Sequence, residues 1–132
     1  MSLATYQAEF TRMVQRLILY ATDEGYALRF GDVWRSTDKL KCPSCSHEAS
    51  YQELLVANGK SKVAFGKHQD RLAVDFIISR TDGEDMHDAD YRKLGEYWEC
   101  LGGRWGGRFG LLLEDYASKI GWDAGHFEKA SQ

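Results

Sequence analysis

Apolar side chains near the N-terminus recur every three or four residues, which is the spacing of one face of a helix. The pattern predicts a helix over residues 3–23, and Gly25 follows where helices commonly end in a left-handed residue. The apolar face of this helix would comprise Tyr6, Phe10, Met13, Val14, Leu17 and Ala21. A second helix is expected to begin at Asp88 as its N-cap and to stop at Gly102-Gly103. Its apolar stripe would comprise Leu94, Tyr97, Trp98 and Leu101.

Alternating, β-branched and aromatic runs predict the strands. Residues 26–30 form one such run, and residues 71–78 form the clearest of the chain, ended by a turn signal at residues 81–83. Asp75 lies in the middle of this second run. Residues 126–128 are expected to form a final edge strand. These elements predict a small α+β fold in which helices flank a central antiparallel sheet.

The remaining segments carry weaker patterns. Residues 36–49 are polar and contain the only proline and two cysteines, so we expect a loop or insertion there. A capping-box pattern at Ser50 favours a short helix through Ala57. Residues 105–107 indicate a tight turn, and residues 111–120 indicate one more short helix.

Length and charge narrow the class of protein. A chain of 132 residues is expected to form one domain, residues 1–132, with a single core. The 17 basic and 20 acidic residues give a net charge of -3 without a basic stripe, which argues against nucleic acids and membranes as partners. No apolar run approaches the ~20 residues of a transmembrane helix, and the N-terminus lacks the features of a secretory signal. We therefore expect the chain to be made and kept in the cytoplasm, where its three cysteines are poor material for a disulfide framework.

Asp75 is the first candidate for chemistry. A carboxylate in the middle of an apolar strand is unfavourable unless it is paired, hydrogen-bonded or bound to a metal. His68, seven positions earlier, and His126, near the C-terminus, could join it. One carboxylate and two imidazoles can fill three positions of a zinc ion and leave the fourth for water, as catalytic zinc requires. The alternative is a capped core aspartate with two surface histidines.

The residues around this trio carry a more specific pattern. Residues 66–75 resemble the SxHxxGxAxD signature of the zinc peptidases that cut D-amino-acid bonds of bacterial peptidoglycan. Gly66 stands in place of the serine of this signature, and Arg71 stands in place of its glycine. A second family motif, a carboxylate three residues before the last histidine, matches Asp123 and His126. The family includes D-alanyl-D-alanine carboxypeptidases, dipeptidases and phage L-alanyl-D-glutamate endolysins.

Further segments extend the resemblance over residues 26–128. Residues 94–109 look like the phage and prophage branch of the family, and residues 31–35 resemble the segment that delivers its active-site arginine. Residues 39–49 and 111–122 depart from the family pattern, the first by a Cys-Pro-Ser-Cys run and the second by its length.

The resemblance implies a role for each of these side chains. Zinc on His68, Asp75 and His126, in a cleft on the sheet, would lower the pKa of a bound water towards ~7 and polarise the scissile carbonyl. Asp123 would be the general base, and Arg35 would stabilise the oxyanion or clamp a substrate carboxylate. The tryptophans Trp34, Trp105 and Trp122 would line the cleft, with core or turn packing as the alternative.

Some residues stay outside this assignment. Cys42 and Cys45 form half of a zinc knuckle, and a second, structural zinc would need further ligands such as His47 and Cys100. Two reduced cysteines in a loop are an equal alternative. Glu128 is expected to lie behind the site or on the surface, and is left outside the set of site residues except as a substitute base, as is Asp115.

The prediction is a zinc-dependent peptidoglycan peptidase of the phage or prophage endolysin type, acting as a monomer on the stem peptide. The bond would be L-alanyl-D-glutamate inside the stem or D-alanyl-D-alanine at its end. Without a signal, the enzyme would reach the cell wall from the host cytoplasm through a separate lysis partner, or would be borne by the virion. The alternative is a zinc-stabilised, non-catalytic module that binds cell-wall peptide or a virion protein, and Asp123 separates the two because only a hydrolase needs a base.

Overall fold

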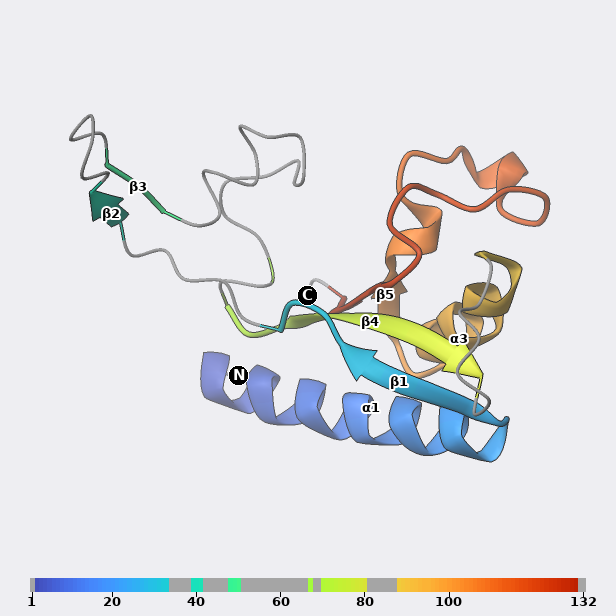
Figure 1. Ribbon diagram of the computed structural model, residues 1–132, viewed down its shortest axis with the longest axis horizontal. Coiled ribbons are helices and arrows are strands. Elements are labelled where there is room, and N and C mark those ends of the chain that lie inside the picture. The colour runs from blue at the N-terminus through green and yellow to red at the C-terminus, as the bar shows by residue number, and fades with distance from the viewer. Residues whose placement is uncertain are drawn as a thin grey trace.

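A sheet of four antiparallel strands, in the order β1-β4-β6-β5, forms the centre of the molecule (Figure 1). The strands are β1 (Tyr26–Phe30), β4 (Ala73–Arg80), β5 (Gly103–Trp105) and β6 (His126–Lys129). A separate antiparallel pair joins β2 (Lys39–Lys41) to β3 (Glu48–Ser50). The computed structural model describes residues 2–33, 39–41, 48–50, 67, 70–80 and 88–130.

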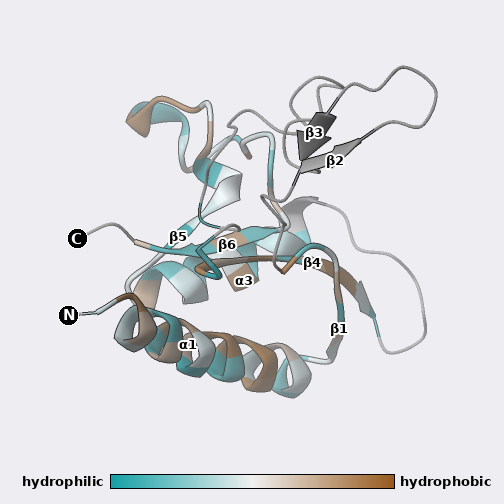
Figure 2. Ribbon diagram, turned by 90° about the vertical axis from the view of Figure 1, so that its left-hand side faces the viewer, coloured by the Kyte–Doolittle hydropathy of each residue, from teal (hydrophilic) through white to brown (hydrophobic). Residues whose placement is uncertain are grey.

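Two helices, α1 (Leu3–Asp23) and α3 (Asp88–Cys100), pack against one face of the sheet (Figures 1 and 2). The side chain of Ser2 caps α1 by accepting a hydrogen bond from a backbone N–H of the first turn. Gly25 and Gly102 follow the two helices with φ angles of 86° and 90°, the left-handed backbone that glycine adopts without steric penalty. The two helices and the glycines that follow them were predicted from the sequence, and the structure confirms both.

The core lies between the helices and the sheet. Trp98 of α3 meets Phe10 of α1 and Phe127 of β6 edge-on, with ring centroids 5.8 Å apart in both pairs. The buried residues of the core are Phe10, Leu17, Ala21, Leu72, Val74, Phe76, Ile78, Leu94, Trp98, Trp105 and Phe127. The two helices thus share one core with the inner face of the sheet, and the α+β prediction is confirmed.

The two faces of β4 differ, because successive side chains of a strand point in opposite directions. Val74, Phe76 and Ile78 are buried against the helices. Asp75 and Ile77 lie between them on the opposite face, half-buried and exposed respectively. The one carboxylate of this strand therefore points away from the apolar core.

The sheet corrects two predictions. Residues 126–128 do form a strand, but β6 pairs with both β4 and β5 and is therefore an interior strand, not an edge. The strand predicted from residue 71 begins at Ala73, because Arg71 has a left-handed φ of 58° that a strand cannot contain.

Residues 111–120 and 36–49 differ from their predictions, whereas a turn does follow β5 as predicted. Residues 111–120 do not form the predicted helix, since only a short 3₁₀ turn, η2 (Leu113–Asp115), occurs there. The turn predicted at 105–107 is a 3₁₀ turn, η1 (Gly106–Arg108), directly after β5. The segment 36–49 contains β2 and most of β3. The short helix predicted after Ser50 falls on residues 51–57, which lie outside the described residues. Among the described residues, no helix is both long and apolar enough to cross a membrane.

Candidate metal centre

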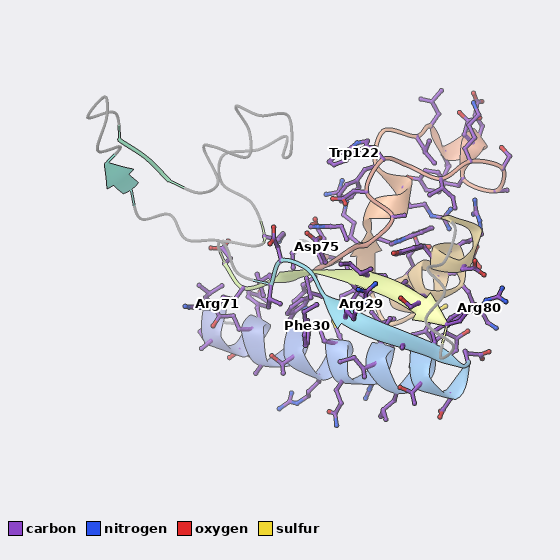
Figure 3. The ribbon with its side chains drawn as sticks, viewed as in Figure 1. Arg29, Phe30, Arg71, Asp75, Arg80 and Trp122 are labelled. Carbon is purple, nitrogen blue, oxygen red and sulfur yellow. The ribbon has the colours of Figure 1, made fainter. Side chains whose placement is uncertain are left out.

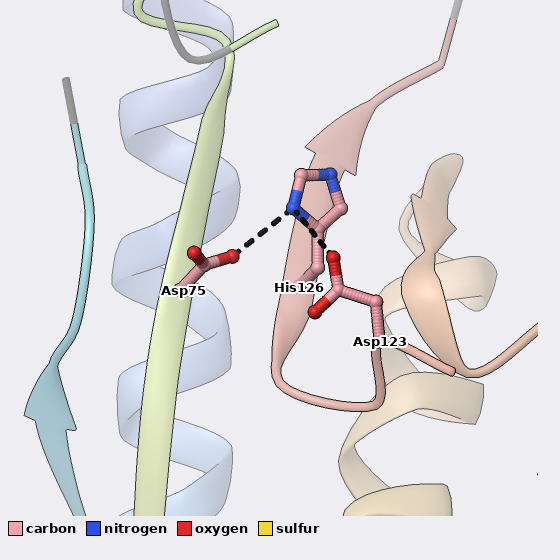
Figure 4. Close-up of side chains that lie close together, drawn as sticks. All are labelled: Asp75, Asp123 and His126. Carbon is pink, nitrogen blue, oxygen red and sulfur yellow. Dashed lines mark hydrogen bonds and ion pairs between the residues drawn. The ribbon is translucent and has the colours of Figure 1, made fainter. Parts of the chain in front are cut away.

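Asp75, Asp123 and His126 come together on the sheet face that points away from the helices (Figures 3 and 4). Asp75 on β4 and His126 on β6 are directly paired across the two strands. Asp123 lies in the turn that enters β6, where its carbonyl accepts the backbone N–H of His126 at 3.0 Å. Two adjacent strands and one turn thus deliver the three side chains.

The Nδ1 atom of His126 is the centre of this cluster. It lies 3.0 Å from Oδ1 of Asp75 and 3.7 Å from Oδ2 of Asp123 (Figure 4). One ligand atom from each of the three residues lies within 4.8 Å of the other two. Imidazole nitrogen and carboxylate oxygen are ordinary zinc ligands, and this spacing suits side chains that converge on one ion.

Glycines fix the turn that carries Asp123. The backbone N–H of Asp123 bonds the carbonyl of Gly106 at 3.3 Å, and that of Gly121 bonds the carbonyl of Gly107 at 2.5 Å. A Cβ atom on Gly106 would collide with the Asp123 carbonyl and would lie 2.8 Å from Cβ of His126. The close approach of these segments therefore requires glycine at position 106.

The charges of the cluster favour a cation. Burial by itself lowers the pKa of His126, but hydrogen bonds to Asp75 and Glu128, together with the charges of Asp75 and Asp123, raise that pKa to about 9. Three carboxylates thus surround one imidazole. When all three are ionised, even a protonated His126 leaves the site with excess negative charge. The donor atoms and the charge both fit a divalent metal ion.

The other predicted site residues have different outcomes. Arg35, His68 and Trp34 lie outside the described residues. Trp105 does not line a cleft, because it is fully buried and its ring lies against Gly95 of α3. Trp122, which precedes Asp123 in the chain, is 56% exposed (Figure 3). Its ring packs against that of Phe109, with the centroids 5.5 Å apart.

Of the three cysteines, Cys100 is the one among the described residues. Cys100 is exposed at the end of α3 as a free thiol. Cys42, Cys45 and His47 lie outside the described residues, so the second zinc stays a prediction.

Glu128 is the site neighbour that sequence reasoning left out. Its side chain is buried beside His126, with Oε1 2.8 Å from Nε2 of that imidazole. The signal available in the sequence was the spacing of two residues within a strand, which puts His126 and Glu128 on the same face of β6.

The comparisons with known proteins agree with this architecture at the level of the fold. No protein-family model and no curated protein matches the chain. Among solved structures, the fold is similar to that of a bacterial endopeptidase. That structure is the L-Ala D-Glu endopeptidase ChiX of Serratia marcescens, with a TM-score of 0.64 and 16% sequence identity. The match covers 93% of this chain and 79% of that chain. At this identity, the likeness shows a shared fold.

Proposed function

We propose that the protein is a zinc-dependent peptidoglycan peptidase whose single domain spans residues 1–132. The metal ligands would be His68, Asp75 and His126. The observation that carries the proposal is the convergence of Asp75, Asp123 and His126 on the sheet face opposite the helices, in a fold shared with an L-Ala D-Glu endopeptidase. The sequence resemblance to the zinc peptidases predicts the same three residues independently of their geometry.

Asp123 is the proposed general base. When bound, zinc supplies Lewis-acid chemistry, which activates water and polarises a carbonyl. The Asp123 carboxylate is farther from His126 Nδ1 than that of Asp75 and is the more exposed of the two, with 36% against 25% of the side chain accessible. It would take the proton of the attacking water and return it to the leaving amine. Asp75, with its shorter contact, would act as a ligand.

Arg35 is proposed to bind the substrate. Its guanidinium is permanently charged and fork-shaped, which suits either the developing oxyanion or a carboxylate of the stem peptide. The fold of the L-Ala D-Glu endopeptidase favours the L-alanyl-D-glutamate bond over the terminal D-alanyl-D-alanine bond. Mass spectrometry of purified muropeptides after digestion would identify the bond that is cut.

The phage or prophage endolysin type is part of the proposal, with the resemblance of residues 94–109 as its support. A monomer of this kind would act from the host cytoplasm after a separate lysis partner opens the membrane, or from the virion. Lysis by the protein added outside intact cells, compared with lysis by the protein expressed alone inside them, tests the need for such a partner.

The decisive experiment compares metal content and turnover in four variants. His68→Ala, Asp75→Ala and His126→Ala are expected to lose zinc and activity together. Asp123→Ala is expected to keep zinc and fold while release of new amino termini from purified peptidoglycan falls by about 10²–10⁴-fold, the typical contribution of a general base. Asp123→Asn, which keeps the size of the side chain, is the matched control for packing. An Asp123→Ala protein that hydrolyses peptidoglycan at the parent rate would refute the assignment.

The same experiment tests a second candidate function, because Asp123 is one of the three residues that could hold the metal. If Asp123 were a fourth ligand, the site would be closed, as structural zinc sites are, and the protein would be a non-catalytic module that binds cell-wall peptide or a virion protein. In that case Asp123→Ala would lose zinc. Retention of zinc with loss of turnover therefore separates the peptidase from the binding module.

Metal stoichiometry also tests the second zinc. A structural ion at Cys42 and Cys45 would raise the content to two per chain, and Cys42→Ser would return it to one. A parent content of one zinc, unchanged in Cys42→Ser, would mean that these cysteines are ordinary reduced thiols.

A further inference from the structure

We propose that Glu128 is a positioning residue for His126: its carboxylate holds the Nε2–H of the imidazole and thereby commits the Nδ1 lone pair to the metal. This inference rests on the proposed zinc site and adds to it a residue that neither sequence motif contains. Strand β6 would then carry both the metal ligand, His126, and the residue that positions it, Glu128.

The geometry around the imidazole carries the argument. Oε1 of Glu128 lies 2.8 Å from Nε2 of His126, whereas Asp75 and Asp123 approach the other ring nitrogen, Nδ1. The two ring nitrogens point in different directions. Glu128 therefore acts on the side of the ring away from the metal cluster, and it is neither a ligand candidate nor a base for water at that cluster.

The chemistry of the imidazole gives this contact its consequence. A neutral imidazole has one N–H donor and one nitrogen with a free lone pair, and the hydrogen bond of one nitrogen decides the state of the other. An ionised carboxylate only accepts hydrogen bonds, so Nε2 keeps its proton beside Glu128, and the proton of Nδ1, which faces Asp75 in the metal-free protein, is the one that a metal displaces. Nδ1, which faces Asp75 and Asp123, is then the nitrogen that can bind the metal. Metal-binding histidines commonly have such a carboxylate partner.

The surroundings of Glu128 hold its carboxylate in this position. Its backbone lies in the interior strand, paired with Ala73 on one side and Arg104 on the other. Its carbonyl accepts the indole N–H of Trp98 at 2.9 Å. Only 6% of the residue is exposed, so the carboxylate is largely shielded from competing water. An acceptor held this rigidly loses little freedom when it binds the imidazole.

Arg104 and Phe109 complete the enclosure. Nη1 of Arg104 lies 3.7 Å from Oε2 of Glu128, so the second carboxylate oxygen faces a positive charge. The same guanidinium lies over the Phe109 ring, 4.7 Å from its centroid, and that ring lies 5.4 Å from the His126 ring. Since the Arg104 side chain is 62% exposed, this ion pair contributes little compared with the buried contact to His126.

Zinc affinity is the first measurement, by competition with a chromophoric chelator at constant pH. Glu128→Ala should weaken zinc binding by about 10–100-fold, the usual effect of removing such a partner. Glu128→Gln keeps an oxygen that can accept the Nε2–H, so its loss should be less than about tenfold. Glu114→Ala, which removes an exposed carboxylate outside the site, is the matched control and should bind zinc as the parent does. Thermal unfolding of the metal-free variants separates any loss of fold from loss of affinity.

Nitrogen NMR of the imidazole is the second measurement, and it does not depend on activity. In the zinc-loaded parent, His126 should show a metal-bound Nδ1 and a protonated Nε2 whose proton exchanges slowly with water. In Glu128→Ala that proton should exchange faster. A parent in which Nε2 binds the zinc would overturn the proposal, and so would Glu128→Ala with unchanged affinity and exchange.

The Asp75→Ala variant shows whether only the role of Glu128 is wrong or the proposed metal site as well. If Asp75→Ala abolishes zinc binding while both Glu128 variants bind as the parent does, only the role of Glu128 is wrong. If Asp75→Ala binds zinc as tightly as the parent does, the assignment of the metal site is wrong, and the role of Glu128 is wrong as well.

Discussion

At the scale of single residues, His126 couples the site to the stability of the fold. In the metal-free protein its pKa of about 9 lies above the ordinary value of 6.5, because carboxylates hold the protonated ring. A raised pKa stabilises the folded state fully below pH 6.5, and this contribution is lost as pH rises through 9. The chelated protein should therefore lose up to about 3 kcal/mol of unfolding free energy across this window.

Urea unfolding at a series of pH values measures this loss. The matched control is His126→Gln, which cannot bind a proton in this range and should remove the difference. Parallel curves for the parent and His126→Gln between pH 6 and 10 would contradict the prediction.

Arg71 gives a second prediction at this scale. It has a left-handed φ of 58° at the position where the zinc-peptidase signature has glycine. A side chain in this conformation is disfavoured by roughly 1–2 kcal/mol relative to glycine. Arg71→Gly should therefore be more stable than Arg71→Ala by about 1 kcal/mol, since both variants lose the same side chain and only one relieves the backbone. Chemical denaturation of the two variants measures the difference, and equal midpoints would refute it.

At the scale of elements, α3 and β5 pack together through Gly95 of the helix and Trp105 of the strand. The ring of Trp105 lies where a Cβ atom of Gly95 would be, and its indole N–H donates to the Ala124 carbonyl at 2.7 Å, next to Asp123. Glycine inside a helix is ordinarily less favourable than alanine by about 1 kcal/mol. Here the collision outweighs that preference, so the packing of α3 also fixes the turn that carries the site.

Gly95→Ala tests which effect dominates. We expect a loss of about 1–3 kcal/mol of unfolding free energy, the usual result of overpacking, in place of the gain that helix propensity predicts. Cys100→Ala, at an exposed position of the same helix, should be close to neutral. A Gly95→Ala protein with raised thermal stability would show that the ring moves aside at little cost.

The same scale shows where a local pattern fails. The helices are predictable because their apolar residues repeat with the helical period. Residues 111–120 instead take their shape from contacts to distant side chains. Arg108 and Arg92 both donate to the Tyr116 carbonyl, at 2.7 and 2.8 Å, and Arg92 also donates to the Lys119 carbonyl at 2.9 Å. The Tyr116 carbonyl is one that a helix over 111–120 would have bonded to its own residue 120, and no periodicity in the segment records that arginines bond it instead.

At the scale of the molecule, strand order and site assembly are long-range properties. Asp75 could be singled out because a carboxylate interrupts an apolar strand, and Asp123 and His126 because their spacing matches a motif. The interior place of β6 could not be inferred, because a four-residue strand does not encode how many neighbours it has. The burial of Glu128 depends on that interior place, which explains why the sequence left it outside the site.

The interior position of β6 also bears on the order of folding. Asp75 and His126 are separated by 51 residues, whereas α1 and α3 form from local contacts. Pairing of such distant segments loses loop-closure entropy before the new contacts stabilise it, so these contacts form late in folding. The metal ligands would then meet only after the rate-limiting barrier. Zinc should slow unfolding and leave the folding rate unchanged, which a chevron plot with zinc and with chelator would reveal as a shift of the unfolding limb alone.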